Sequence, residues 1–186
     1  MRDPKQIVLA SLAYAKEQRS RSWWHYGTTL AVLFGLAATI CCLDPWWIRV
    51  PASLLLGLVL VRVFIIYHDY QHGTILKGSR LAGAFLYFYG LLVLNPPSIW
   101  SRSHEHHHRN VGTYPVMTSA AWAKAGRWER LRYVLQRHPL TIAAGYLTIF
   151  FYGMCVRSFL VDKRQHVDSA LAVAVHSAAI VLLAVF

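Results

Sequence analysis

The chain has 186 residues, of which 56% are hydrophobic and only 15% are charged, and its formal net charge is +11. Soluble domains average about 25% charged residues, so this composition argues against a soluble globule and excludes a disordered chain. Basic charge on so apolar a chain indicates loops on the cytoplasmic side of a membrane, and we expect membrane lipids and no nucleic acid as partners.

Four apolar segments are long enough to cross a bilayer, namely residues 26–43, 50–67, 139–156 and 169–186. Residues 1–22 form a charged tail, and no small-residue cleavage site follows the first segment, so we expect that segment to be retained. The predicted fold is all-α, an integral membrane helical bundle of about four transmembrane helices plus interfacial helices. We expect a single membrane domain over residues 1–186, with a cytoplasmic region at 68–138.

A fifth apolar run, residues 81–94, is closed by Asn95, Pro96 and Pro97. Fourteen residues are short for a crossing, which favours a re-entrant or interfacial helix. If the run does not cross, the tail and residues 68–138 share one side and carry 14 of the 19 Lys and Arg residues. The positive-inside rule then predicts cytoplasmic termini, with a bacterial inner membrane as the location.

Apolar residues recur at helical spacing within residues 119–137, and basic residues occupy the rest of the helical wheel. This pattern is typical of a helix that lies on an anionic leaflet. A basic soluble helix that packs on the neighbouring region remains an alternative.

Two histidine motifs lie in the region between the second and third apolar segments. The first is HDYQH, in which His68 and His72 are four residues apart. Residues i and i+4 share one face of a helix, so both imidazoles are able to reach one metal ion. Two histidines that merely mark the membrane boundary are the alternative interpretation.

The second motif is HEHHH, and its spacing is more specific. His104, His107 and His108 fall within an arc of about 100° on a helix, whereas His106 points to the opposite side. Neutral imidazoles are nitrogen ligands for iron, zinc or copper. The motif also satisfies H-E-x-x-H, in which a zinc protease would use His104 and His108 as ligands and Glu105 as general base. That alternative leaves the first motif unused.

Together the two motifs resemble the membrane fatty acid desaturase superfamily of bacterial type. HDYQH is similar to the family's H-x3-H box and HEHHH to its H-x2-H-H box, in the same order after a hairpin of two spans. The resemblance implies a non-haem di-iron centre that uses O2 to dehydrogenate the acyl chain of a lipid or acyl thioester. It also implies an electron donor such as a ferredoxin or cytochrome. The implied iron ligands are His68, His72, His104, His107 and His108, with Asp69 and Glu105 orienting imidazoles through their second ring nitrogen.

The family's third box, H/Q-x2-H-H, has no counterpart here, because His138, His166 and His176 are isolated. We therefore expect the chain to be the N-terminal portion of a desaturase and to be inactive alone. A non-catalytic, truncated or degenerate paralogue is one alternative, and a lipid or carotenoid hydroxylase or ketolase is another. His176 lies in the middle of an apolar segment, where we expect a neutral, hydrogen-bonded packing role.

Overall fold

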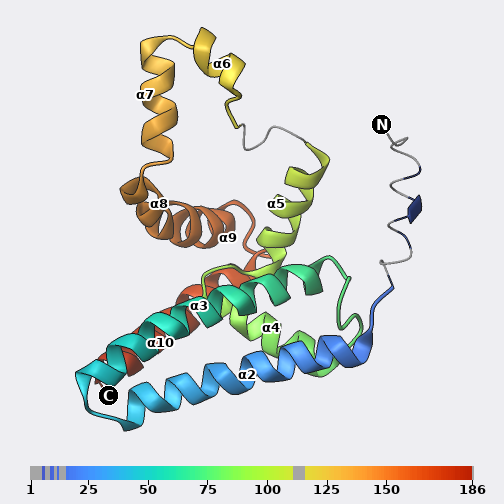
Figure 1. The fold of residues 1–186 in the computed structure, drawn as a ribbon, viewed down its shortest axis with the longest axis vertical. Helices are drawn as coiled ribbons and strands as arrows, with labels where there is room; N and C mark the ends of the chain where they lie inside the picture. The colour runs from blue at the N-terminus through green and yellow to red at the C-terminus, as the bar shows by residue number, and fades with distance from the viewer. Residues whose placement is uncertain (1–5, 7–8, 11, 13–15, 111–115, 186) are drawn as a thin grey trace. The chain divides into compact units, whose positions relative to one another are not determined.

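The computed structural model describes residues 6, 9–10, 12, 16–110 and 116–185. These residues form helices and turns and no strand, which confirms the all-α class. Half of the predicted tail and the final residue of the fourth apolar segment, Phe186, lie outside the described part. The helices in chain order (Figure 1) are α2 (Arg19–Cys42), α3 (Trp46–Gln71), α4 (Arg80–Leu92), α5 (Pro97–Arg109), α6 (Ser119–Lys124), α7 (Arg127–Gln136), α8 (Pro139–Gly145), the π-helix η2 (Tyr146–Arg157), α9 (Ser158–Val161) and α10 (Val167–Val185).

The chain divides into two compact units, one up to Leu86 and one from Tyr87 onward. In the first unit, α2 and α3 run antiparallel and side by side (Figure 1). Pro45 precedes the first turn of α3 and lacks the backbone N–H that a continuous helix would need, so the chain turns there. Between the two helices, Arg62 Nε donates a hydrogen bond to Thr29 Oγ1 at 2.8 Å.

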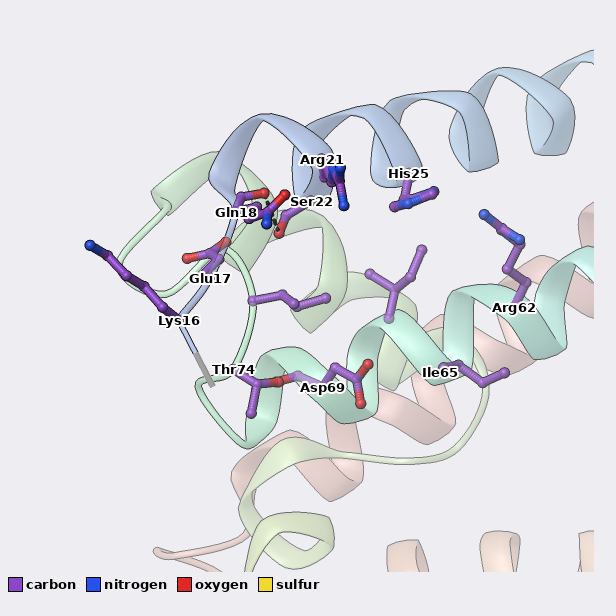
Figure 2. A pocket seen from close by; sticks show the side chains of 12 residues that line it. Lys16, Glu17, Gln18, Arg21, Ser22, His25, Arg62, Ile65, Asp69 and Thr74 are labelled. Atoms are coloured by element: carbon purple, nitrogen blue, oxygen red, sulfur yellow. Dashed lines mark hydrogen bonds between the residues drawn. The ribbon is translucent and has the colours of Figure 1, made fainter. Parts of the chain in front are cut away.

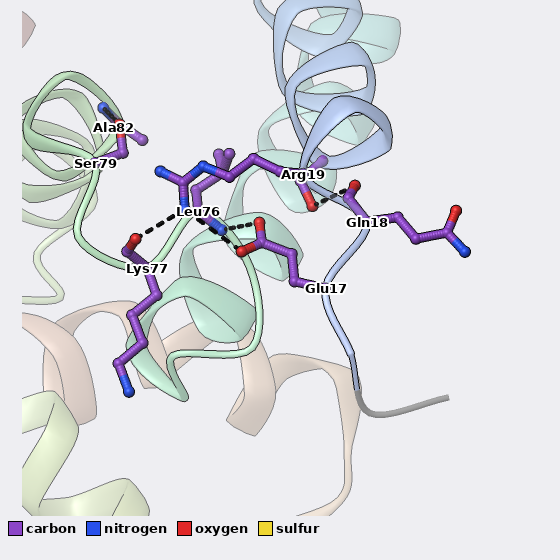
Figure 3. Close-up of polar contacts among 8 residues, drawn as sticks. Glu17, Gln18, Arg19, Leu76, Lys77, Ser79 and Ala82 are labelled. Atoms are coloured by element: carbon purple, nitrogen blue, oxygen red, sulfur yellow. Dashed lines mark hydrogen bonds and ion pairs between the residues drawn. The ribbon is translucent and has the colours of Figure 1, made fainter. Parts of the chain in front are cut away.

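A tight loop joins α3 to α4 and is tied to the segment that precedes α2. The loop uses positive φ angles at Gly73, Leu76 and Gly78, of which only Leu76 (φ 49°) carries a side chain. Leu76 is fully buried, and its backbone N–H donates to Glu17 Oε1, while Arg19 donates to the carbonyl of Lys77 at 2.8 Å (Figure 3). The Leu76 hydrogen bond lowers the pKa of Glu17, because it favours the ionised carboxylate.

Helix α4 covers the short apolar run, and its 13 residues span only about 20 Å. Leu94 then adopts a positive φ of 57°, and the chain bends by 88° into α5, which begins at Pro97. Such a bent pair is either a broken span or a re-entrant segment. A re-entrant or interfacial α4 therefore stays a prediction.

The second unit packs the end of α4 and the turn after it, η2 and α10 around a small apolar core. Leu91, Leu94, Cys155 and Ala172 are its buried members. Ser169 Oγ donates to the carbonyl of Met154 at 3.1 Å, which joins the start of α10 to η2. Helices α8, η2 and α9 follow one another without a break over Pro139–Val161, with a π-helical stretch of 12 residues at the centre.

The prediction of one continuous helix within residues 119–137 is wrong, because this segment forms two helices. Ala125 and Gly126 are extended, so the segment forms the two short helices α6 and α7. Glycine favours such a break, because its backbone loses most entropy in a helix. Arg130 on α7 links the two helices, because it donates hydrogen bonds to the carbonyls of Trp122 and Ala123 on α6. Its guanidinium lies 5.5 Å from the centre of the Trp122 ring.

Among the described residues, four helices are long and apolar enough to cross a membrane, and each corresponds to one of the four predicted segments. They are Arg19–Cys42, Trp46–Gln71, Pro139–Val161 and Val167–Val185. Their large apolar side chains are mostly exposed, for example Leu54 and Leu58 on α3 and Leu183 on α10. A protein in water would bury such continuous apolar faces, so these faces are suited to contact with lipid. The protein is a helical membrane protein.

Candidate metal centre

The first histidine pair lies at the end of α3, beside the turn into the loop. The ring centroids of His68 and His72 are 4.5 Å apart, as expected for neighbours on one helical face. The Nδ1 atom of His68 lies 3.0 Å from Asp69 Oδ1. A carboxylate in this position fixes the ring orientation and tautomer, and a metal ion bound through Nε2 would leave that contact in place.

Contacts with α4 and with the loop between α3 and α4 stabilise the position of the first motif. Tyr70, between the two histidines in the sequence, packs so closely on α4 that its hydroxyl lies 2.6 Å from the position of a Cβ atom added to Gly83. A Cβ atom at this position would force the Tyr70 side chain to shift. The Glu17 and Arg19 contacts described above hold the loop that starts at His72, the residue that caps α3.

The second histidine motif lies on the last two turns of α5. The Nε2 atoms of His104 and His108 are 2.9 Å apart, and their ring centroids are 4.5 Å apart. This contact is a hydrogen bond between the two rings, and two nitrogens bound at about 2.1 Å to one tetrahedral metal ion would lie only slightly farther apart, at about 3.4 Å. The pair is therefore close enough to bind one metal ion.

His107 belongs to the same face, as the sequence predicts. Its ring centroid is 6.1 Å from that of His104 and 5.6 Å from that of His108. His106 lies elsewhere: its Nδ1 is 3.1 Å from the side-chain amide nitrogen of Asn110, and it lines a different cavity with Arg157 and His166. The three clustered imidazoles form a compact set of nitrogen donors on one side of the helix.

The two acidic residues of the motifs have different partners. Asp69 contacts His68, which is the contact expected of a residue that orients an imidazole. The contact recorded for Glu105 is a 2.6 Å ion pair with Arg109, one turn further along α5. This ion pair engages the carboxylate that a zinc protease would use to activate water.

The amino-terminal end of α5 is held by residues that the sequence did not reveal as partners. The carboxylate of Asp168 accepts hydrogen bonds from both the backbone N–H of Ser98, at 2.8 Å, and its hydroxyl, at 2.5 Å. The Ser98 hydroxyl oxygen also lies 2.8 Å from Nδ1 of the buried His166. One turn from the histidines, Trp100 stacks on His104 with ring centroids 4.4 Å apart. The contacts of Asp168 orient α5, and the Trp100 stack orients His104.

His176 is hydrogen-bonded through both ring nitrogens. Its Nδ1 lies 2.6 Å from the carbonyl oxygen of Leu92, and its Nε2 lies 2.5 Å from the hydroxyl of Tyr146. These contacts confirm the hydrogen-bonded packing position expected of this residue.

A scan against protein-family models matches residues 44–186 to the model described as "Fatty acid desaturase". A relative named "Fatty acid desaturase" from Bacillus subtilis (strain 168) is 27% identical over 145 residues, which cover 73% of this chain and 41% of the relative. An "sn-1 oleoyl-lipid 12-desaturase" from Anabaena variabilis is 22% identical over 185 residues, which cover 95% of this chain and 52% of the relative.

The chain thus spans about half the length, or less, of these two curated relatives. No solved structure matches it significantly. The family model covers well over half of the chain, including both histidine motifs, and agrees with the all-helical membrane fold. This protein belongs to the fatty acid desaturase family.

Proposed function

We propose that the protein is a lipid-metabolism oxidoreductase that dehydrogenates an acyl chain with O2 at a histidine-ligated iron centre. The observation that carries the proposal is the 2.9 Å separation of His104 Nε2 and His108 Nε2, within a chain that matches the desaturase family model. Breaking an unactivated C–H bond lies beyond any protein side chain, so a metal has to supply that chemistry.

The proposed ligands are His68 and His72 from α3 and His104, His107 and His108 from α5. The donor set fits iron, because imidazole is an accepted iron ligand and each motif already holds its rings close together. When bound, the iron would activate O2 toward the acyl C–H bonds. We infer that the two motifs meet at one centre and that a di-iron site takes further ligands beyond these five.

The chain's own residues would orient and shield this centre. Asp69 keeps the His68 ring in one orientation, and Trp100 does the same for His104 through stacking. The apolar spans offer a water-poor route for an acyl tail, whether lipid-linked or thioester-linked. Removing two hydrogens from the chain while O2 becomes two waters needs two external electrons, which we assign to a ferredoxin- or cytochrome-type donor.

We also propose that both histidine motifs face the cytoplasm of a bacterial inner membrane, together with the two termini. The support is the distribution of Lys and Arg, of which 14 of 19 lie in the tail and in residues 68–138. Labelling of single cysteines introduced at position 79 and at position 44 of a cysteine-free background with a membrane-impermeant maleimide tests this orientation. Intact cells should label position 44 and protect position 79; the reverse pattern would overturn the orientation.

The test of function uses the full-length protein in its native membrane. We expect His104→Ala and His108→Ala to lower the bound iron and to abolish O2-dependent formation of unsaturated acyl chains, measured by gas chromatography of fatty acid methyl esters. His106→Ala is the matched control, because it removes an imidazole from the other side of the same helix. Wild-type iron content in His104→Ala, or equal losses in His106→Ala, would contradict the proposal.

The same experiment separates the other candidates. Oxygenated products in place of unsaturated ones would indicate a hydroxylase or ketolase, and no iron in the wild type would indicate a non-catalytic paralogue. Glu105→Gln would abolish the activity of a zinc protease, whereas the Arg109 ion pair makes us expect little change in desaturation.

A further inference from the structure

Three cations of the first unit that the metal centre does not use line a cavity between α2 and α3. The cavity has a volume of about 660 Å³, within the range of about 300–1,000 Å³ that is usual for ligand sites. Figure 2 shows Arg62 reaching from α3 toward α2, with His25 on the side of α2 that faces α3. Lys16 and Arg21 also line the space.

Arg62 is a charged residue within the predominantly apolar helix α3. It is six residues before His68 on an apolar helix, about 9 Å along the axis from the end that carries the first motif. Charged residues inside a span are costly and as a rule mark a binding or transport site. Its Nε–H bonds to Thr29, and among the described residues no carboxylate pairs with it. The guanidinium fork is therefore left for a ligand with several oxygen atoms.

The cavity also contains two carboxylates, but each has a partner. Glu17 accepts from the backbone N–H of Leu76 and lies 3.5 Å from Arg19. Asp69 lies 3.0 Å from His68 Nδ1. Arg21, like Arg62, forms no ion pair with a described carboxylate. The electrostatic balance of the cavity thus favours an anion.

The helix end at the cavity adds to this balance. Helix α2 is 24 residues long, begins at Arg19, and has no acidic residue in its first turn and no side-chain cap at Gln18. Its first backbone N–H groups carry partial positive charge, which stabilises a phosphate group. Gln18, Arg21 and Ser22 from this end all line the cavity.

The remaining wall is apolar. Ile65, Ile66 and Ile75 line the cavity, and the neighbouring side chains Val61 and Leu58 are exposed on the outer surface of α3. A free phosphate ion gains no binding free energy from an apolar wall, whereas an amphiphile contacts the cations with its head group and buries apolar surface against the wall. We propose that this cavity binds the phosphate head group of a membrane phospholipid between α2 and α3, with Arg62 and Arg21 contacting the phosphate.

This inference goes beyond the proposed function, because it requires neither iron nor turnover. It concerns a lipid held by the first unit alone, whether or not that lipid is ever oxidised. A phosphate group accepts two parallel hydrogen bonds from arginine but only a single point contact from lysine. We therefore expect Arg62→Lys to bind more weakly than the wild type and more tightly than Arg62→Gln.

The test titrates phosphatidylglycerol into delipidated full-length protein and follows the lipid-bound species by native mass spectrometry. We expect one tightly held phospholipid, with affinity about tenfold lower in Arg62→Gln and in Arg21→Gln. Arg80→Gln is the matched control: it removes one exposed cation from the same unit, outside the cavity, and should bind as the wild type does.

Three results would overturn the proposal. Equal lipid affinity in Arg62→Gln and Arg80→Gln would show that the cavity does not hold the head group. Tight binding of a phosphate-free glycolipid would show that phosphate is not recognised, and displacement of the lipid by millimolar inorganic phosphate would indicate a site for free anions. Size-exclusion profiles establish that the variants are folded, and iron measured on the same samples reports separately on the metal centre.

Discussion

Removing the Asp168 carboxylate should loosen the helix that carries the second histidine motif. Asp168 lies in the first turn of α10 and accepts two hydrogen bonds from Ser98, in the first turn of α5. Hydrogen bonds to a charged group contribute about 1.5–3 kcal/mol each. Asp168→Asn keeps one carbonyl oxygen, so we expect it to lose about one such bond, or about 1.5–3 kcal/mol of unfolding free energy.

For a chain of this length, about 1 kcal/mol shifts the melting temperature by about 2–4 °C, which predicts a decrease of about 3–12 °C. The assay is thermal unfolding in detergent, followed by far-UV circular dichroism. Asp44→Asn is the control, because Asp44 is exposed in the turn between α2 and α3 and forms no ion pair with another described residue. Equal melting temperatures for the two variants would refute the anchoring role of Asp168.

A double-mutant cycle separates this pair from a general loss of charge. Ser98→Ala removes only the hydroxyl and leaves the backbone N–H in place. If the two side chains act together, Ser98→Ala combined with Asp168→Asn should destabilise by less than the sum of the single effects. Strict additivity would mean that the two side chains do not interact in the folded protein.

Two further predictions concern the first unit. A hydrogen bond from Leu76 lowers the folded-state pKa of Glu17, so this contact is fully formed above the unfolded-state pKa and is lost as the pH falls through the lower folded-state pKa. Hydrogen exchange of the Leu76 amide, corrected for its intrinsic rate, should therefore speed up in acid, and Glu17→Gln should abolish that change. Gly83→Ala should lower the free energy of unfolding by about 1–3 kcal/mol, since its Cβ would meet the Tyr70 hydroxyl. Gly27→Ala is the control for this thermal unfolding experiment: its Cβ would meet nothing within 4 Å, so the variant should be neutral or slightly more stable.

The sequence alone determined the features that depend on local composition and period. Long apolar segments with at most one charge predict the membrane helices wherever they occur, because the bilayer selects for length and hydropathy rather than for particular partners. The i, i+3 and i, i+4 spacing of His104, His107 and His108 likewise predicts their common face, since a helix imposes that geometry. The structure confirms both.

Tertiary structure decided which side chains hold the motifs in place. Asp168 lies 70 residues from Ser98, and no local pattern marks either as the partner of the other. The break at Ala125 and Gly126 was missed because the apolar period continues across it, although the backbone is extended there. In the sequence, Arg62 is simply the one charge within the second apolar segment; only the packing of α2 against α3 places it beside Thr29 in a cavity. Contacts between distant segments depend on how helices pack, and that information is spread over the whole chain rather than carried by any short motif.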